Sequence, residues 1–282
     1  MIRELKKVDD HISLFEMKSN ALEVLVTNFG GTIIRLLMPD KNGQKGDVVL
    51  GYDSIAEYQT KDAYLGALVG RTANRTRKGT FSLNGKTYTL PLNDGPNSLH
   101  GGAHGFSQKV FDAKIQGDSL VQTYLSPDGE EGYPGNLRLT ATYTLKGGTL
   151  TLRYQATTDQ DTLINITNHS YFNLSGGQED ICNHTLQVHS DTYACIDANG
   201  LPTGEFRDTQ GTPFDFHTPA RIGDVLARQD EQLTLGRGVD HPFLFNHAED
   251  QVVLCHPASG RRLTISSTLP GTQVYTGNQL DG

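Results

Sequence analysis

The chain has 282 residues, with 24 Lys and Arg against 32 Asp and Glu, so its formal net charge is −8. This length suits one large β domain or two average domains, and the acidic balance argues against a nucleic-acid partner or an acidic membrane surface. No apolar run approaches the roughly 20 residues of a membrane helix, and the first residues contain no apolar signal-peptide core. We therefore expect a soluble protein with a neutral substrate.

Cysteine usage indicates the redox environment. Cys182, Cys195 and Cys255 form an odd set, and no pair has the Cys-x-x-Cys spacing of a metal or redox motif. We interpret them as free thiols in a reducing compartment, rather than as a disulfide framework or a zinc site. The sequence therefore predicts a cytoplasmic protein without a structural metal.

Short strands separated by turn residues recur along the chain. Residues 22–26 alternate between apolar and polar, a turn follows at residues 28–31, and residues 33–37 form a second strand. Asn84-Gly85, a strong hairpin signal, and Gly147-Gly148 each join two strand-like runs. Further strands are expected at residues 162–167, 186–189, 251–255, 263–267 and 273–275.

Helical signals are few. Residues 55–59 and 219–227 each allow about two turns of helix, the second with a proline near its start. The chain shows no linker, no low-complexity tract and no clear internal repeat. Many short strands with regular turns predict an all-β fold, a large antiparallel β-sandwich or barrel with few short helices, in one domain.

One motif combines a histidine with amides, a hydroxyl and two aromatic rings. It covers residues 168–174, Asn-His-Ser-Tyr-Phe-Asn-Leu, and ends in the breaker Ser-Gly-Gly. Flat apolar faces beside short polar groups are typical of a sugar site, and His169 can carry a proton near neutral pH. The alternative is a core strand with a hydrogen-bonded histidine.

An arginine motif and a glycine-rich loop supply further candidates. Residues 70–75, Gly-Arg-Thr-Ala-Asn-Arg, follow an apolar segment, and the planar fork of Arg71 suits a fixed oxygen acceptor. The alternative is a surface ion pair. Residues 97–106 contain His100 and His104 among glycines that permit close approach to a ligand. We discount a zinc site, because i,i+4 histidines bind zinc from a helix; an exposed turn is the alternative.

Two acidic stretches complete the candidates. Residues 128–135 form an acidic turn without EF-hand spacing, so a solvated turn is favoured over a calcium loop, although its tyrosine and proline could wall a pocket. Asp240 precedes His241 and Pro242, and the proline favours an extended backbone before it. An extended carboxylate can accept two sugar hydroxyls; a strand-end turn residue is the alternative.

These pieces, in this order, resemble the aldose 1-epimerase (galactose mutarotase) family. The resemblance implies one large β-sandwich, the galactose mutarotase-like supersandwich. It also implies an isomerase that interconverts the α and β anomers of a free hexose, such as galactose or glucose, without a cofactor or metal. The matching stretches span nearly the whole chain: residues 70–75, 99–102, 126–136, 168–174, 201–204, 238–243 and 275–278.

The resemblance also implies roles for individual residues. His169 matches the general acid that protonates the ring oxygen. Arg71, Asn74, His100 and Asp240 match positions that hold the hydroxyls of the sugar, and His100 also helps to polarise the ring oxygen. The chemistry is coherent, because opening a hemiacetal needs one proton delivered to the ring oxygen and one removed from the anomeric hydroxyl.

The general base of the family is a glutamate downstream of the Tyr-Thr-Gly-Asn motif at residues 275–278. No glutamate follows Glu249, and Asp281 lies in the wrong context. We therefore expect residues 1–282 to form a single domain without this base and without the final strands. The alternatives are a non-catalytic sugar-binding or regulatory protein, and a hexose-6-phosphate 1-epimerase, for which residues 71–78 are the one basic cluster. The preferred sugar and the oligomeric state stay undetermined.

Overall fold

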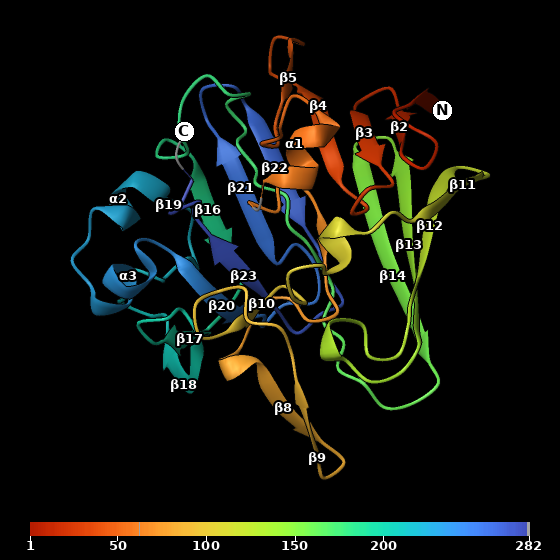
Figure 1. Ribbon diagram of the computed structural model, residues 1–282. Coiled ribbons are helices and arrows are strands. Elements are labelled where there is room, and N and C mark those ends of the chain that lie inside the picture. The colour runs from red at the N-terminus through yellow and green to blue at the C-terminus, as the bar shows by residue number, and fades with distance from the viewer. Residues whose placement is uncertain (62, 281–282) are drawn as a thin grey trace. The chain divides into compact units, whose positions relative to one another are not determined.

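Antiparallel strands are the main secondary structure of the chain (Figure 1). The computed structural model describes residues 1–61 and 63–280, with 44% of the chain in strands and 9% in short helices. Globular proteins average about a third helix, so the predicted all-β class is confirmed. Among the described residues, no helix has the length and apolarity required to cross a bilayer.

The described chain forms two compact units. Unit 1 contains residues 1–38 and 49–172, and unit 2 contains residues 39–48 and 173–282. The single domain expected from the sequence stays a prediction, and each unit is described by itself below.

The first sheet of unit 1 contains the strands β1 to β4. Alternate residues of β2 and β3, including Phe15, Met17, Val24 and Val26, are buried, which is the period-2 pattern of a strand with one face in a core. The β3–β4 hairpin confirms the strands predicted from residues 22–37. The antiparallel order is β1-β2-β3-β4, with bounds Ile2–Lys7, Ser13–Lys18, Glu23–Thr27 and Ile33–Pro39.

The second sheet of unit 1 has the order β11-β12-β13-β14. The hairpin predicted at Gly147-Gly148 joins β13 and β14, whose register runs from Lys146 opposite Thr149 to Leu137 opposite Thr158. Leu120, Leu139, Ala141 and Tyr143 are fully buried on one face. The bounds are Asp112–Gln116, Ser119–Ser126, Leu137–Lys146 and Thr149–Thr158.

The buried faces of these two sheets form a sandwich. Figure 1 shows β12 to β14 beside β2 to β4. Two buried hydrogen bonds connect the layers: Gln122 Nε2 donates to Thr27 O at 3.2 Å, and the Tyr143 hydroxyl donates to Gly31 O. Buried polar side chains of this kind need partners, so they also fix how the sheets align.

The remaining elements of unit 1 are short and carry most of the candidate residues. The helix α1 confirms the prediction at residues 55–59, and a capping box between Ser54 and Glu57 begins it. The predicted Asn84-Gly85 turn joins β8 and β9. Bounds are Ile55–Thr60 (α1), Leu68–Val69 (β6), Arg75–Thr76 (β7), Thr80–Leu83 (β8), Lys86–Thr89 (β9), Ser98–Leu99 (β10) and Thr167–Asn168 (β15), with 3-10 turns at Arg77–Gly79, Phe106–Gln108 and Glu130–Gly132.

Unit 2 contains two antiparallel sheets, β19-β16-β21-β22 and β18-β17-β20-β23. Its core includes the stacked rings of Tyr193 and Phe214, with Phe216, Phe243 and Leu233. Bounds are Lys45–Asp47 (β5), Thr185–Val188 (β16), Thr192–Ile196 (β17), Pro202–Asp208 (β18), Ala220–Arg221 (β19), Ile222–Leu226 (α2), Glu231–Gly236 (α3), Asp240–Leu244 (β20), Val252–His256 (β21), Arg261–Ile265 (β22) and Gly271–Tyr275 (β23).

One expectation about local structure was wrong. Residues 162–167 do not form a continuous strand; Asn165 makes a single parallel bridge to Thr72, and β15, at Thr167–Asn168, pairs with β6. Such short pairings depend on distant segments more than on local pattern. The helix α3 was not predicted, although the sequence contains a local signal for it: Asp230 is a typical N-cap whose side chain accepts from the amides of Gln232 and Leu233.

Candidate active site

The rings of His100 and His169 lie together in unit 1. Their centroids are 5.0 Å apart, and the planes meet edge to face at 88°. Two tyrosines flank the pair: Tyr64 lies 4.7 Å from His100 and 5.8 Å from His169, and Tyr171 lies 5.0 Å from His169. Segments far apart in the sequence therefore meet to form a half-buried cluster of two histidines and two phenol rings.

Short pairings hold each histidine by its backbone. The amide of His169 donates to Ala67 O at 2.8 Å, and Gly66 N donates to His169 O at 3.0 Å, which extends the β6–β15 pairing by one residue. The amide of His100 donates to Asn74 O at 3.1 Å, beside the β7–β10 pair. A Cβ atom at Gly101 would come 1.9 Å from Gly70 O, so only glycine allows this approach at its φ of +88°.

The environment of His100 fixes its protonation state. Its Nδ1 accepts from the amide of Asn74 at 3.2 Å, so the proton of the neutral ring is on Nε2. Burial, with the nearby charges of His169 and Arg75, lowers the pKa of His100 to about 3. His100 is therefore a neutral ring that can donate one hydrogen bond through Nε2.

His169 has a different environment. Burial lowers the pKa of His169 below its usual 6.5, although a hydrogen bond with its own backbone opposes this shift. Among the described residues, no side chain bonds to its ring; its ring neighbours are Tyr64, Tyr171 and His100. The ring is therefore held by its backbone and by packing, which leaves its nitrogens able to exchange a proton with a ligand.

The structure corrects the expected role of Arg71. Arg71 is 2% exposed, and its guanidinium donates to the carbonyls of residues 126, 127, 134 and 135 and to the Ser126 hydroxyl, at 2.8–3.1 Å. All its nitrogens are engaged with the protein, so it has no donor to spare for a sugar. Arg71 instead holds both ends of the acidic turn at residues 128–135.

The neighbouring Arg75 lies closer to the histidines. It is the first residue of β7 and pairs with Leu99, directly before His100, and its charge contributes to the low pKa of His100. Its Nε donates to Asp94 at 2.7 Å, an ion pair that fixes the head group. Asn74 lies between Arg71 and Arg75 in the chain. Its φ is +65°, and its Oδ1 accepts from the amide of Arg75. Sequence reasoning missed Arg75, although it ends the same motif as Arg71.

Asp240 belongs to unit 2. It begins β20 opposite Tyr275 of β23, and its Oδ1 accepts from Gln273 Nε2 at 2.7 Å. The motif at residues 275–278 supports the segment before it, because Thr276 Oγ1 accepts from Val239 N and Asn278 Nδ2 donates to Val239 O. Asp240 is half-buried, and its backbone is extended as the sequence predicts.

The comparisons with known proteins agree with this geometry. The family model described as aldose 1-epimerase matches residues 13–282. The chain is 42% identical to human galactose mutarotase over 99% of its own length and 81% of the human protein, and 36% identical to aldose 1-epimerase of Escherichia coli K12 over 95% and 80%. The chain belongs to the aldose 1-epimerase family.

A solved structure supports the family fold. The galactose 1-epimerase of Lactobacillus acidophilus NCFM superposes with a TM-score of 0.88 at 32% identity, covering all of this chain and 83% of that one. The galactose mutarotase-like fold expected from the resemblance is confirmed, as are the isomerase class and the mutarotase function. The assignments to individual residues stay predictions.

Another histidine, His184, has a structural environment. It follows the typical turn residues Cys182 and Asn183, yet it is fully buried and its Nε2 accepts from the amide of Leu174 at 2.8 Å. Its ring stacks on His256 at 4.6 Å. In contrast, His104 of the glycine-rich loop is exposed, as one of the alternatives for that loop predicts.

Proposed function

We propose that His169 is the proton donor in the interconversion of the α and β anomers of a free hexose, such as galactose or glucose. Members of the family act on free aldoses, which supports this class of substrate. The observation that carries the proposal is the His100–His169 ring pair, with centroids 5.0 Å apart and tyrosines on both sides. Such rings suit the apolar faces of a sugar, and the ring nitrogens suit its oxygens.

The two histidines have different roles in this proposal. His100 stays neutral because its pKa is about 3, so its Nε2–H donates a hydrogen bond to a sugar oxygen and helps to polarise it. His169 in its protonated form delivers a proton to the ring oxygen, and the C1–O5 bond breaks as the anomeric hydroxyl loses its proton. Rotation about the C1–C2 bond and closure on the other face reverse both transfers.

Hydroxyl recognition in unit 1 involves Asn74 and Arg75. Arg75 replaces Arg71 in this proposal, because it lies next to His100 in space and its guanidinium is half-buried rather than enclosed. For Asp240, in unit 2, the family resemblance implies that the carboxylate accepts from sugar hydroxyls. A carboxylate suits the role of the general base that takes the anomeric proton. The family resemblance assigns this base to a position beyond residues 275–278.

The setting proposed for this activity is the cytoplasm, without a metal or cofactor. Cys182, Cys195 and Cys255 are unpaired thiols, which is usual in a reducing compartment. Proton transfer between histidine, carboxylate and sugar needs no metal, and the neutral ring of His100 takes the polarising role that a metal has in other enzymes.

A polarimetric assay on freshly dissolved α-galactose, α-glucose and α-glucose 6-phosphate tests the proposal. The free sugars should reach anomeric equilibrium faster with the protein than in buffer, and the phosphorylated sugar should not. Arg75→Leu should raise KM about tenfold, since a charge-assisted hydrogen bond contributes about 1.5–3 kcal/mol. His104→Ala, an exposed change in the glycine-rich loop that contains His100, is the control. Equal rates with and without protein would refute the proposal.

A further inference from the structure

Tyr64 lies in a turn that is bonded to the backbone of His169. Ala67 N donates to Tyr64 O at 3.0 Å and closes the turn. The same turn exchanges two backbone hydrogen bonds with His169, through Gly66 N and Ala67 O, at 3.0 and 2.8 Å. The position of the Tyr64 ring is therefore coupled to that of the histidine by rigid backbone rather than by a flexible loop.

The backbone of Tyr64 is unusual. Its φ is +55°, in the left-handed region that bulky residues rarely occupy. Such a conformation costs on the order of 1–3 kcal/mol and persists when the surroundings dictate it. Gly66 shows how tight these surroundings are, because a Cβ atom there would lie 2.0 Å from Ile33 O. The turn thus directs an aromatic ring to a fixed place at an energetic cost.

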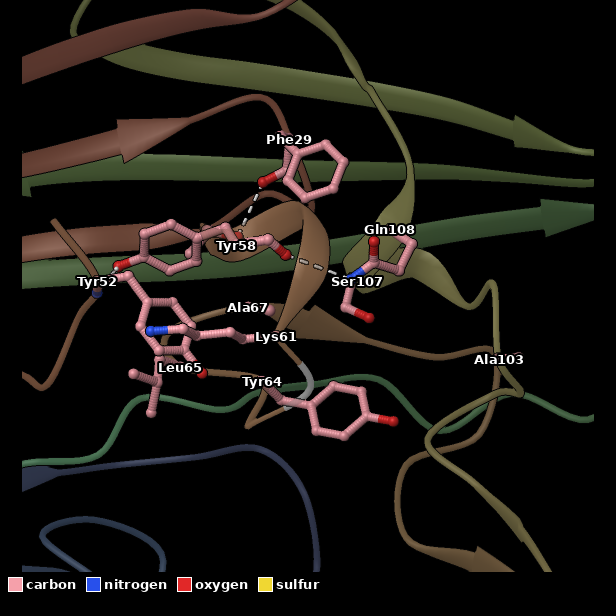
Figure 2. A pocket seen from close by; sticks show the side chains of 11 residues that line it. Phe29, Tyr52, Tyr58, Lys61, Tyr64, Leu65, Ala67, Ala103, Ser107 and Gln108 are labelled. Carbon is pink, nitrogen blue, oxygen red and sulfur yellow. Dashed lines mark hydrogen bonds between the residues drawn. The ribbon is translucent and has the colours of Figure 1, made fainter. Parts of the chain in front are cut away.

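Tyr64 contacts both the two histidines and a cavity. On one side it meets His100 edge-on at 4.7 Å and His169 at 5.8 Å. It also lines a cavity of about 60 Å³, whose described lining contains neither histidine. Figure 2 shows Tyr52, Tyr58 and Lys61 grouped together in this cavity, with the ring of Tyr64 turned away from them.

The cavity has the size and polarity to hold water. A water molecule needs roughly 10–15 Å³ of such volume and two to four polar partners. Lys61, Gln108 and the tyrosine hydroxyls of the lining supply polar groups. Tyr64 therefore adjoins both a space that water can occupy and two half-buried histidines.

We propose that Tyr64 is a positioning residue for the anomerase reaction: its ring holds His100 and His169 in their edge-to-face orientation and keeps the water of the cavity away from them. This inference rests on the proposed function, because it concerns the same pair of histidines. It adds a residue that does not touch the reacting atoms and acts through the two that do.

The electrostatics of the site agree with this role. Burial is the largest cause of the low pKa of both histidines. The groups that face them are few: His100 faces His169, Arg75 and Tyr64, and His169 faces His100, Tyr64 and Tyr171. On the cavity side, Lys61 is paired with Glu57 at 2.8 Å. Removing the ring of Tyr64 should expose both histidine rings to water and raise the pKa of each toward 6.5.

Tyr64→Leu, Tyr64→Phe and Tyr52→Leu test the proposal in the full chain. Tyr64→Leu removes the ring and should lower kcat about tenfold with little change in KM. It should also raise the pKa of His169 by roughly half a unit or more, measured by NMR titration of the ligand-free protein. Tyr64→Phe keeps the ring and should restore kcat and pKa to within about twofold and a few tenths of a unit. Tyr52→Leu enlarges the cavity without touching a histidine and should change neither.

The outcomes separate this inference from the proposed function. If the unmodified protein accelerates mutarotation but Tyr64→Leu matches it in kcat and in the pKa of His169, the role of Tyr64 is refuted and the function stands. The role is also refuted if Tyr52→Leu shifts the pKa equally, or if Tyr64→Phe is as damaging as Tyr64→Leu. If the unmodified protein is inactive, the function fails, while the NMR titration still reports whether Tyr64 shields His169.

Discussion

Two pairs of histidines, one in each unit, differ in what their rings bind. The rings of His100 and His169 meet edge to face at 88°, whereas His184 and His256 stack at 23° with centroids 4.6 Å apart. In unit 2 the protein occupies three of the four ring nitrogens: His184 Nε2 accepts from Leu174 N, and the nitrogens of His256 lie 2.6 Å from Glu179 and 2.9 Å from Ser259. The fourth, His184 Nδ1, is buried and has no hydrogen-bond partner among the described residues.

The difference separates a structural pair from a chemical one. A histidine whose ring is bonded to the protein on both sides gains stability but has no nitrogen to offer a ligand. His169 is held through its backbone instead, and its ring contacts other rings. The residue type is the same in the two pairs, but His184 and His256 are buried whereas His100 and His169 are half-buried. The pairs therefore differ both in burial and in which atoms of the histidine the protein uses.

The largest effect expected is that of His169→Ala on catalysis. It should lower kcat by about 10² to 10⁴ fold, which is the usual contribution of a positioned general acid, and should change Tm little, because its ring makes no hydrogen bond to a described side chain. Polarimetry and thermal unfolding measure the two effects. A large fall in Tm with kcat per folded molecule unchanged would show that His169 stabilises the fold and takes no part in catalysis.

His184→Ala should have the opposite profile. It leaves the amide of Leu174 without its acceptor and a cavity beneath the stacked ring of His256, so unfolding should become easier by about 2–4 kcal/mol. Denaturant unfolding measures this, with the exposed His104→Ala as a control expected within about 0.5 kcal/mol of the unmodified protein. The comparison breaks down if His184→Ala lowers kcat of the folded protein as much as His169→Ala.

Stability should fall in acid because of buried histidines. Burial is the main reason that the pKa of His184 and that of His241 are both lowered to about 4. Above about pH 6.5 both are neutral, folded or unfolded. Between pH 6.5 and pH 4 only the unfolded chain takes up these protons, so each residue removes about 1.4 kcal/mol of stability per pH unit. Urea unfolding at several pH values tests this, and His241→Gln should reduce the slope; an unchanged slope would contradict it.

Exhaustive chelation is expected to affect neither activity nor stability. Neither histidine pair needs a metal: His184 and His256 are bonded to protein groups, and His100 uses Nδ1 to accept from Asn74. Mutarotation rate and Tm should both be unchanged after treatment with a chelator. A loss of rate that one divalent metal restores would show that the pair in unit 1 is a metal site instead.

The sequence predicts those features that depend on neighbouring residues better than those that depend on residues far away along the chain. The hairpins and α1 follow from local turn and capping residues, and the His169 and His100 motifs stand out because short polar and glycine residues surround them. Arg71 and Arg75 are indistinguishable locally. Their roles separate only because the carbonyl groups that bind Arg71 lie more than 50 positions later in the chain.

The same limit applies to the buried position of His184, which the sequence does not indicate. Its neighbours Cys182 and Asn183 are typical turn residues, and nothing local indicates that the amide of Leu174 and the ring of His256 enclose it. The helix α3 is the opposite case, because Asp230 is a local signal that the sequence does contain.

The strand β1 has a consequence for how the protein behaves in concentrated solution. It is the outermost described strand of its sheet, and its residues Arg3, Glu4, Lys6 and Lys7 are exposed. The free side of an outer strand is a template on which a second molecule can add its own strand, the first step of many aggregates. Charges of both signs along this strand would have to lose their water for such pairing to occur. The charged residues of β1 therefore favour separate, dispersed molecules where a plain apolar strand would favour fibres.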